Sequence, residues 1–259
     1  MQFEDLIYEI RNGVAWIIIN RPEKMNAFRG KTCDELIKAL YKAGYDKDVG
    51  AIVLAGAGDR AFCAGNDLKW QAAGGERGWN TSGFGGLTLR FDCDKPIIAA
   101  VNGVAMGGGF EIALACDLIV ASENATFALP EPRVGLAALA GGLQRLPRQI
   151  GLKRAMGMIL TGRHVSAREG LELGFVNQVV APGEALKAAE RWADQICQNS
   201  PMSIRASKQA VMRGLNVALP EAMVAQREYP AVRDMIQSAD YVEGPKAFAE
   251  KRPPRWQGK

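Results

Sequence analysis

The chain of 259 residues is long enough for one large domain, or for a core with a smaller appended region. Hydrophobic residues make up 48% and charged residues 23%, which are ordinary values for a soluble globular protein. The net charge of +4 is small and Lys and Arg are spread along the sequence, so charge alone does not indicate nucleic-acid binding.

No secretory or membrane segment is predicted. The N-terminus is acidic and lacks a basic region followed by an apolar one. The most apolar stretch, residues 97–115, is interrupted by Asn102, four glycines and Glu111, which excludes a membrane span. The five cysteines are odd in number and form no Cys-x-x-Cys pair, which is typical of reduced thiols. We therefore expect a cytoplasmic protein.

The N-terminal third begins with a predicted hairpin and a helix. Residues 6–10 and 14–19 favour strands, and Asn12-Gly13 between them is typical of a two-residue hairpin turn. Thr32 and Glu35 have the spacing of a capping box, which predicts a helix that starts there and ends before Gly44.

A buried strand over 49–55 is followed by the loop 61–68, whose backbone N–H groups are candidate hydrogen-bond donors to a ligand. Residues 69–90 carry six glycines and little periodicity. We expect a flexible segment there that covers a site as a lid, although an ordinary disordered surface loop explains the composition equally well.

The central stretch, residues 96–131, combines a strand, a glycine turn and a helix start. The apolar run 97–101 predicts a strand buried on both faces, and three glycines at 107–109 precede a helix-forming segment. Amides at a helix start have no intrahelical acceptor, and missing side chains let a ligand approach them. Glu111 lies in that first turn, and Glu131 follows twenty residues later. Tight packing and a dipole-stabilising cap are the structural alternatives.

The remaining chain alternates short strands with helices and then becomes helical. Ser166 to Glu169 forms a second capping box that Gly174 closes, and strand–strand–helix units recur before residue 180. We expect a core over residues 1–196 and a C-terminal helical region over 197–259. The other predicted elements are strands 118–121, 126–129 and 175–180, helices starting at Gly142 and covering 153–160, a helix with the apolar stripe Leu186, Ala189, Ala193 and Ile196, and helices 202–214, 219–238 and 244–251.

Two strand-end loops with exposed amides can grip one oxygen atom together. The stretches that supply them, Phe62 to Leu68 and Asn102 to Glu111, resemble the two signature sequences of the crotonase (enoyl-CoA hydratase/isomerase) superfamily. The resemblance extends from Val14 to Arg252. Residues 1–62 look most similar to ring-opening 2-ketocyclohexanecarboxyl-CoA hydrolases and the remainder to hydratases, which indicates a hybrid or engineered chain as one alternative.

The resemblance implies an α/β fold, the crotonase (ClpP-like) spiral of repeated strand–strand–helix units, and four catalytic positions. By resemblance the amides of Asn66 and Gly108 stabilise the developing charge on a thioester oxygen. Hydratases of the family carry glutamates that match Glu111 and Glu131, whereas isomerases generally lack the first. We therefore expect hydration of an enoyl-CoA, in which Glu111 activates water and Glu131 exchanges the proton at the α-carbon.

The resemblance implies that the acyl group of the substrate is carried by coenzyme A. Lys24 and Lys69 resemble positions that contact its nucleotide end, and Ala64 matches a position whose backbone lies near the adenine. Phe248 and Lys251 resemble a tail segment that reaches a CoA, often in a neighbouring subunit. Each lysine alone is better explained as solvated surface charge. The family assembles as trimers or dimers of trimers, so we expect such a homo-oligomer, with the thioester as substrate and no separate cofactor.

The sequence gives little support for other kinds of active site. His164 is the single histidine and no Gly-x-Ser-x-Gly elbow exists, so neither a catalytic triad nor a metal site is predicted. The rival reactions within the family are ring-opening hydrolysis of a β-keto acyl-CoA and double-bond isomerisation. The rival from another class is RNA binding, known from one branch of the family. Its sign is a lysine-rich helix, and only Lys31, Lys38 and Lys42 lie near helix 32–44.

Overall fold

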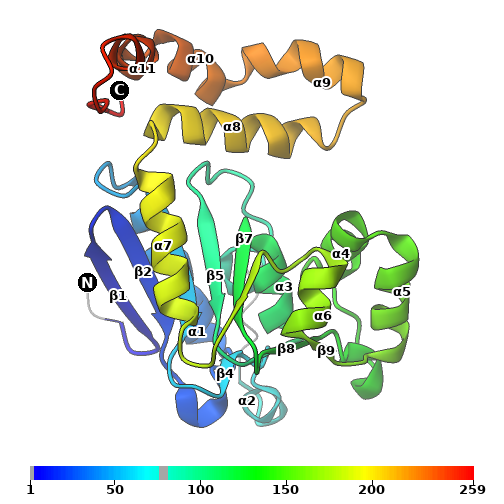
Figure 1. Cartoon of the computed structure of the whole chain (residues 1–259). Coiled ribbons are helices and arrows are strands. Elements are labelled where there is room, and N and C mark those ends of the chain that lie inside the picture. Colours follow the sequence, from blue (N-terminus) through cyan, green and yellow to red (C-terminus); the bar gives the residue numbers. More distant parts are fainter. Residues whose placement is uncertain (1–2, 76–80) are drawn as a thin grey trace.

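The computed structural model describes residues 3–75 and 81–259 (Figure 1). The chain opens with the predicted hairpin, β1 (Leu6–Arg11) and β2 (Val14–Ile19), in which Leu6 pairs with Ile19 and Arg11 with Val14. Asn12 and Gly13 both have positive φ, of 52° and 74°. This is the backbone that a two-residue type I′ turn requires, so the hairpin prediction is confirmed.

A six-stranded sheet forms the centre of the described chain, in the order β1-β2-β3-β5-β7-β10. From β2 onward its neighbours are parallel, and the strands are β3 (Ala51–Gly56), β5 (Ile97–Val101), β7 (Leu118–Ser122) and β10 (Gln178–Val180). Every residue of β3 and β5 is buried, as continuous apolar runs predict for central parallel strands. The last strand is shorter than the predicted range 175–180.

A second, four-stranded sheet in the described residues was only partly predicted. It has the order β4-β6-β8-β9 and contains β4 (Ala61–Cys63), β6 (Val104–Met106), β8 (Thr126–Ala128) and β9 (Val165–Ser166). β6 lies where the sequence predicted only a turn between strand 97–101 and the glycines. Strands of two or three residues are too short to show an alternating pattern, and pairing with neighbours defines them.

Helices cover both sides of the larger sheet (Figure 1). The larger buried cluster includes side chains from α1 (Gly30–Tyr45) and α3 (Gly108–Ala115), such as Leu36, Leu40 and Ile112. A smaller cluster lies under α7 (Ala185–Cys197), whose small residues face Trp16 and Val53. The apolar stripe predicted for α7 was wrong at Leu186, which is 37% exposed; the buried face of the helix runs through Ala185, Ala188, Ala189 and Ala193.

The start of α1 corrects the sequence prediction. The helix begins at Gly30 with Arg29 as its N-cap residue, three residues before the predicted cap Thr32, and it ends at Tyr45, beyond Gly44. Thr32 occupies the third helical position, where its hydroxyl accepts from the N–H of Arg29 at 3.3 Å. Glu35 does not bond back to Thr32; its carboxylate accepts the N–H groups of Glu4 and Asp5. Contacts with the N-terminal segment therefore replace the predicted local cap.

The segment predicted to be flexible, 69–90, is largely structured where it is described. α2 (Leu68–Ala72) starts it, and the short η2 helix (Phe84–Gly86) follows residues 76–80, which lie outside the described range. Phe84 through Thr88 are buried, and Phe84 stacks on Phe28 with ring centroids 5.2 Å apart. Residues 84–88 therefore belong to the core and do not form a lid.

The chain between β8 and β10 forms a lateral lobe (Figure 1). Its helices are η3 (Glu131–Val134), α4 (Gly142–Ile150), α5 (Leu152–Thr161) and α6 (Ala167–Leu173). The second predicted capping box is confirmed in part: the Ser166 side chain accepts the N–H of Glu169 at 3.1 Å and Gly174 ends the helix in a left-handed conformation, but the Glu169 carboxylate pairs with Arg163.

The C-terminal helices lie as a layer beyond one end of the sheet (Figure 1). α7 ends at Cys197 and α8 (Pro201–Gly214) begins the layer, which continues through α9 (Leu219–Ala225), η4 (Gln226–Glu228), α10 (Pro230–Gln237) and α11 (Ala239–Ala249). The predicted helix 219–238 is broken, because Tyr229 before Pro230 is extended. The division of domains at residue 197 stays a prediction. None of the described helices is long and apolar enough to span a membrane.

Candidate active site

The four predicted catalytic positions line one cavity of about 360 Å³. Its walls come from the loop after β4, the start of α3, η3 and the segment between η3 and α4. The lining residues are Ala64, Gly65, Asn66, Leu68, Gln71, Phe84, Gly107, Gly108, Glu111, Pro130, Glu131, Val134, Leu136, Ala137, Leu139 and Ala140. A larger, polar cavity of about 920 Å³ between the end of α1 and the C-terminal layer contains none of the predicted site residues.

The loops that carry Asn66 and Gly108 are in direct contact. A Cβ atom added to Gly65 would lie 2.8 Å from the carbonyl oxygen of Met106 and 3.2 Å from the nitrogen of Gly108. Gly65 also has a φ of +91°, which disfavours other residues. Glycine at 65 therefore permits the approach of the two loops, and the amides of Asn66 and Gly108 are presented from adjoining segments.

The start of α3 lines the cavity with Gly107 and Gly108. Gly107 is the N-cap residue and Gly108 the first helical residue, whose N–H has no acceptor within its own helix. A Cβ atom at Gly108 would lie 2.3 Å from a ring carbon of Phe84. The helix dipole adds a positive potential at this end. The two loops together can accommodate a developing negative charge on an oxygen atom.

Glu111 is buried in the wall of the cavity, with 3% of its surface exposed. Its Oε1 accepts the N–H of Gly142 at 2.9 Å. Burial, with a smaller contribution from the nearby charge of Glu131, raises the pKa of Glu111 to about 7 against the opposing hydrogen bond from the Gly142 amide. A carboxyl group with a pKa near neutrality can both accept and donate a proton.

Glu131 faces the same cavity from η3. Its Oε1 lies 3.0 Å from the position that a Cβ atom of Gly107 would occupy, which places the carboxylate beside the start of α3. Burial raises the pKa of Glu131 as well. Its Oε2 is buried and has no hydrogen-bond partner among the residues that the structure describes. A buried carboxylate oxygen without a protein partner is suited to hold water or a substrate group.

The residues predicted to contact CoA fall into two groups. Lys24 lies exposed at the end of η1 (Pro22–Lys24), Lys69 lies exposed on α2, and Ala64 lines the cavity. Phe248, which is 87% exposed, and Lys251 lie at the end of α11 and line no part of the cavity. Of the five residues only Ala64 lines the cavity, and α11 and α2 lie at opposite ends of the molecule (Figure 1). The roles of all five residues stay predictions.

Some residues of the site were not singled out from the sequence. Gly142, whose amide binds Glu111, was noted only as the start of a helix, and Phe84 fell in the segment predicted to be flexible. Gln71 contributes to the cavity wall, and its Oε1 accepts the side-chain N–H of Asn66 at 2.5 Å. The paired glycines at 141–142 before a helix were the available signal, because they repeat the pattern at 107–109.

Comparisons with known proteins agree with this architecture. The Enoyl-CoA hydratase/isomerase family model matches residues 9–259. Carnitinyl-CoA dehydratase of Proteus mirabilis (strain HI4320) is 41% identical over 256 residues, which covers 96% of this chain and 97% of that protein. The carnitinyl-CoA dehydratase of Salmonella typhi is also 41% identical, over 257 residues with the same coverage.

Solved structures of enoyl-CoA hydratases superpose closely on this chain. An enoyl-CoA hydratase from Mycobacterium tuberculosis H37Rv matches with a TM-score of 0.93 and 38% identity, covering 98% of this chain and 99% of that chain. A probable enoyl-CoA hydratase/isomerase from Mycobacterium abscessus matches with a TM-score of 0.92 and 40% identity over 100% of both chains. The predicted fold class is confirmed. The chain is an enzyme of the enoyl-CoA hydratase/isomerase family, the crotonase superfamily.

Proposed function

We propose that the protein is an enoyl-CoA hydratase, which adds water across the 2,3 double bond of an unsaturated acyl-CoA. The observation that carries the proposal is that Glu111 and Glu131 line one cavity with Asn66 and Gly108. Two carboxyl groups can divide the two proton transfers of hydration, and two amides can hold the thioester oxygen.

In the proposed reaction the Glu111 carboxylate takes a proton from water as the water oxygen bonds to C3. The electron pair of the double bond moves toward the thioester oxygen, where the amides of Asn66 and Gly108 stabilise the negative charge. The protonated carboxyl group of Glu131 then gives its proton to C2 as the carbonyl reforms. Proton exchange between the acids and solvent returns both to their starting states, so one water is added in total.

A second candidate is the dehydration of carnitinyl-CoA, favoured by the names of the 41% identical relatives. The same acids can run this reaction, because dehydration is the reverse of hydration. A carnitinyl group carries a trimethylammonium, which needs aromatic faces or an anion around it. The cavity holds Phe84 and the two carboxylates, but these face the reacting centre in the proposed reaction, and the wall between η3 and α4 is apolar, with Val134, Leu136 and Leu139 at the cavity. We therefore favour an uncharged acyl group.

The test is incubation with enoyl-CoAs of different length and branching, carnitinyl-CoA and 2-ketocyclohexanecarboxyl-CoA, read by mass spectrometry. Hydration adds one water with the double bond lost, isomerisation adds none, and ring opening yields a dicarboxylic product. We expect gain of water with an apolar enoyl-CoA, and loss of that activity in Glu111→Gln. Turnover of carnitinyl-CoA alone would favour the second candidate, and no turnover of any enoyl-CoA would refute hydration.

The same substrate panel also tests the alternative reactions predicted from the sequence. Ring opening of 2-ketocyclohexanecarboxyl-CoA would support the hydrolase resemblance of residues 1–62 and the hybrid origin, which stay predictions. The curated relatives align across 96% of the chain, so single proteins match both parts. RNA binding stays the rival outside catalysis, and a salt-dependent mobility shift with AU-rich RNA would support it.

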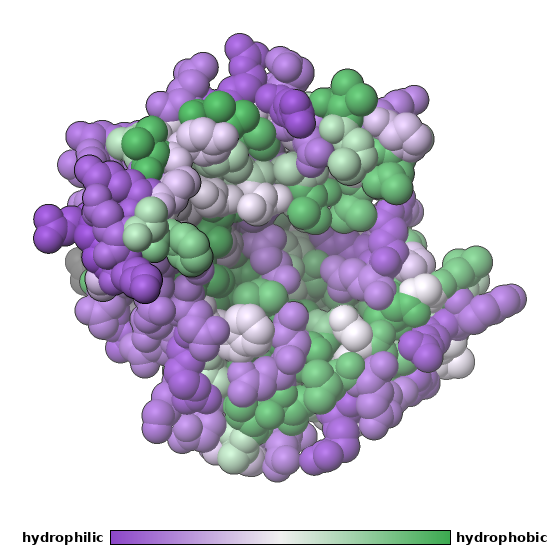
Figure 2. Space-filling view, turned by 45° about the horizontal axis from the view of Figure 1, so that its top comes forward, coloured by the Kyte–Doolittle hydropathy of each residue, from purple (hydrophilic) through white to green (hydrophobic). Residues whose placement is uncertain are grey.

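We also propose that the protein forms a trimer or a dimer of trimers through its C-terminal layer, and that it acts in the cytoplasm. Large apolar side chains are exposed on this layer, among them Leu215, Leu219, Val224, Val242 and Phe248. Figure 2 shows hydrophobic residues gathered on one face of the molecule, both at its surface and within a hollow. Exposed apolar surface of this extent favours association. Sedimentation equilibrium tests the assembly, and a monomeric mass would refute it.

A further inference from the structure

The loop that carries Asn66 is tied to the segment 25–28 by backbone hydrogen bonds on both sides of that residue. The N–H of Ala64 donates to Met25 O at 3.0 Å, and the N–H of Phe28 donates to Gly65 O at 2.8 Å. The N–H of Asp67 donates to Phe28 O, also at 2.8 Å. Asn66 and Phe28 thus form an isolated parallel bridge. Successive peptide groups alternate in direction in such a bridge, so the Asn66 N–H points away from Phe28.

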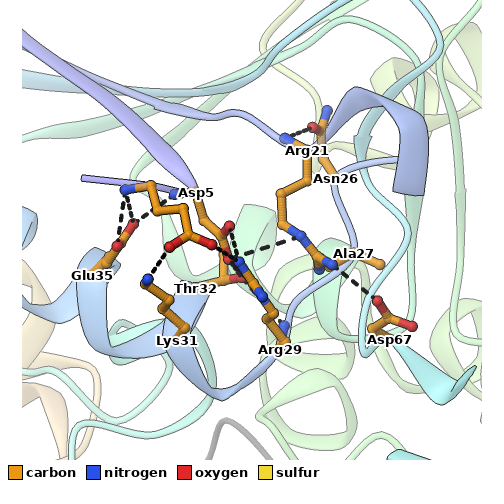
Figure 3. Close-up of polar contacts among 10 residues, drawn as sticks. Asp5, Arg21, Asn26, Ala27, Arg29, Lys31, Thr32, Glu35 and Asp67 are labelled. Carbon is orange, nitrogen blue, oxygen red and sulfur yellow. Dashed lines mark hydrogen bonds and ion pairs between the residues drawn. The ribbon is translucent and has the colours of Figure 1, made fainter. Parts of the chain in front are cut away.

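One guanidinium group holds both sides of this bridge (Figure 3). Arg21 donates through Nη1 to the carbonyl oxygen of Ala27, and its Nη2 lies 3.2 Å from Oδ2 of Asp67. The other oxygen of Asp67 accepts the N–H of Trp70 at 3.1 Å and caps α2. The side chains of Arg21 and Asp67 are only 10% and 12% exposed, so solvent screens their ion pair weakly.

The segment that carries Arg21 is itself fixed. The buried side chain of Asn26 accepts the N–H of Arg21 at 3.0 Å and donates to the carbonyl oxygens of Ala57 and Ala61. Asp5 lies 3.8 Å from Nε of Arg21, but its main partner is Arg29, which bonds to both of its carboxylate oxygens. Arg29 therefore shares the network without contacting Asp67.

We propose that Arg21 is a positioning residue for the backbone N–H of Asn66, through its ion pair with Asp67 and its bond to Ala27. The inference rests on the proposed function for its effect on turnover, because the Asn66 amide acts only when charge develops on the thioester oxygen. Displacement of a reacting group by 1 Å can lower a rate by about 100-fold. Arg21 contacts neither glutamate, so its loss affects charge stabilisation and leaves the proton-transfer groups unchanged.

The experiment compares Arg21→Gln, Arg21→Lys and Asp67→Asn with the matched control Arg29→Gln. We expect Arg21→Gln to lower kcat by about 10- to 100-fold while KM for the enoyl-CoA changes by less than about threefold. Arg21→Lys should recover only part of the loss, because one ammonium does not reproduce the two-sided guanidinium contact. Asp67→Asn keeps the helix cap and loses the ion pair, so the double variant with Arg21→Gln should be no slower than Arg21→Gln alone.

Arg29→Gln should keep kcat within about twofold, because it weakens the Asp5 cluster and spares the Asp67 pair. All rates are measured below the unfolding transition of every variant. A kcat loss in Arg29→Gln equal to that in Arg21→Gln would overturn the proposal, and so would an unchanged kcat in Arg21→Gln. The apparent pKa values of the pH–rate profile should stay unchanged in Arg21→Gln, and a shift would also overturn it.

If the wild-type protein hydrates no enoyl-CoA, the proposed function fails and hydrogen exchange decides the inference alone. We expect the peptide that covers residues 63–68 to exchange about tenfold faster in Arg21→Gln than in the wild type. Arg29→Gln should leave the exchange of this peptide unchanged. Equal exchange in Arg21→Gln and the wild type would overturn the positioning role.

Discussion

Replacement of Glu111 by Gln should make the protein more stable at alkaline pH while it removes activity. The carboxyl group is 3% exposed, and burial raises its pKa from the ordinary 4.5 to about 7. Below pH 4.5 the group is protonated in both folded and unfolded chains, so burial carries no charge penalty. Between pH 4.5 and about 7 the unfolded chain ionises this group while the folded chain keeps it protonated, so the stability of the folded protein falls across this interval and levels off above it. At 1.36 kcal/mol per pH unit, the interval from 4.5 to about 7 corresponds to roughly 3 kcal/mol.

Gln retains the oxygen that accepts the Gly142 amide and carries no charge, so it isolates this penalty. The measurement is urea unfolding of wild type and Glu111→Gln at pH 5 and pH 8, with Glu172→Gln, an exposed site, as the control. The free energy of unfolding of Glu111→Gln relative to wild type should increase by roughly 2 to 3 kcal/mol between the two pH values. The control should show no such pH-dependent difference.

Hydration of an enoyl-CoA is measured on the same samples. We expect Glu111→Gln to lose at least about 100-fold in kcat, because the amide cannot accept a proton from water. A stability difference that does not change with pH would refute the inferred burial penalty. Full activity in the variant would refute the role of Glu111 as the group that activates water.

Three further predictions follow from the same geometry. Glu131→Gln should lower kcat for hydration by about 100-fold or more, and wild-type turnover in the mass assay would contradict its role. The wild-type kcat/KM should rise with an apparent pKa of about 7 as Glu111 loses its proton, and a flat profile across that pH would contradict this assignment. Gly65→Ala should lower the unfolding free energy by more than about 1 kcal/mol; the control Gly174→Ala has a similar φ of +98° but nothing within 4 Å of its added Cβ, so equal losses would refute the close contact.

The sequence predicted the parts of the site that depend on local pattern. Buried strands are visible as apolar runs, and glycines before a helix indicate exposed amides, so Gly108 and Glu111 could be located at a helix start. The loop with Asn66 follows another buried strand. In the structure the two loops follow β4 and β6, which are parallel neighbours in the smaller sheet and therefore end at the same edge.

The capping box at Thr32 and Glu35 shows where local pattern misleads. Both residues have the right spacing, but each bonds to the N-terminal segment: the Thr32 hydroxyl donates to Asp5 at 2.5 Å, and Glu35 accepts the N–H of Asp5 at 2.8 Å. Burial alone would raise the pKa of Asp5, but hydrogen bonds from Arg29 and Thr32 outweigh it and lower the pKa. Tertiary partners thus compete with a local motif for the same side chains.

The glycine-rich segment 83–88 shows the reverse case. Its composition is typical of a flexible loop, yet Gly85 and Gly86 adopt positive φ and lie against Ile112 and Ile37. A Cβ atom at Gly86 would lie 2.3 Å from a side-chain carbon of Ile37. These glycines allow close packing, and composition alone does not distinguish that use from flexibility.

The residues proposed to carry out the chemistry can be predicted from local sequence patterns, whereas the residues that hold them in place cannot. An amide proposed to act in catalysis, such as that of Gly108, can be located from the glycines and strand beside it, within ten residues along the chain. The groups that hold it come from elsewhere: Arg21 meets Asp67 across 46 positions, and Gly142 meets Glu111 across 31. Such long-range pairs produce no periodic pattern in the sequence, because the residues around each partner reflect only the local helix, strand or loop in which it lies. The geometry of the cavity therefore depends on contacts that become visible only after folding, and substitutions at Arg21 or Gly142 test it as directly as substitutions of the glutamates.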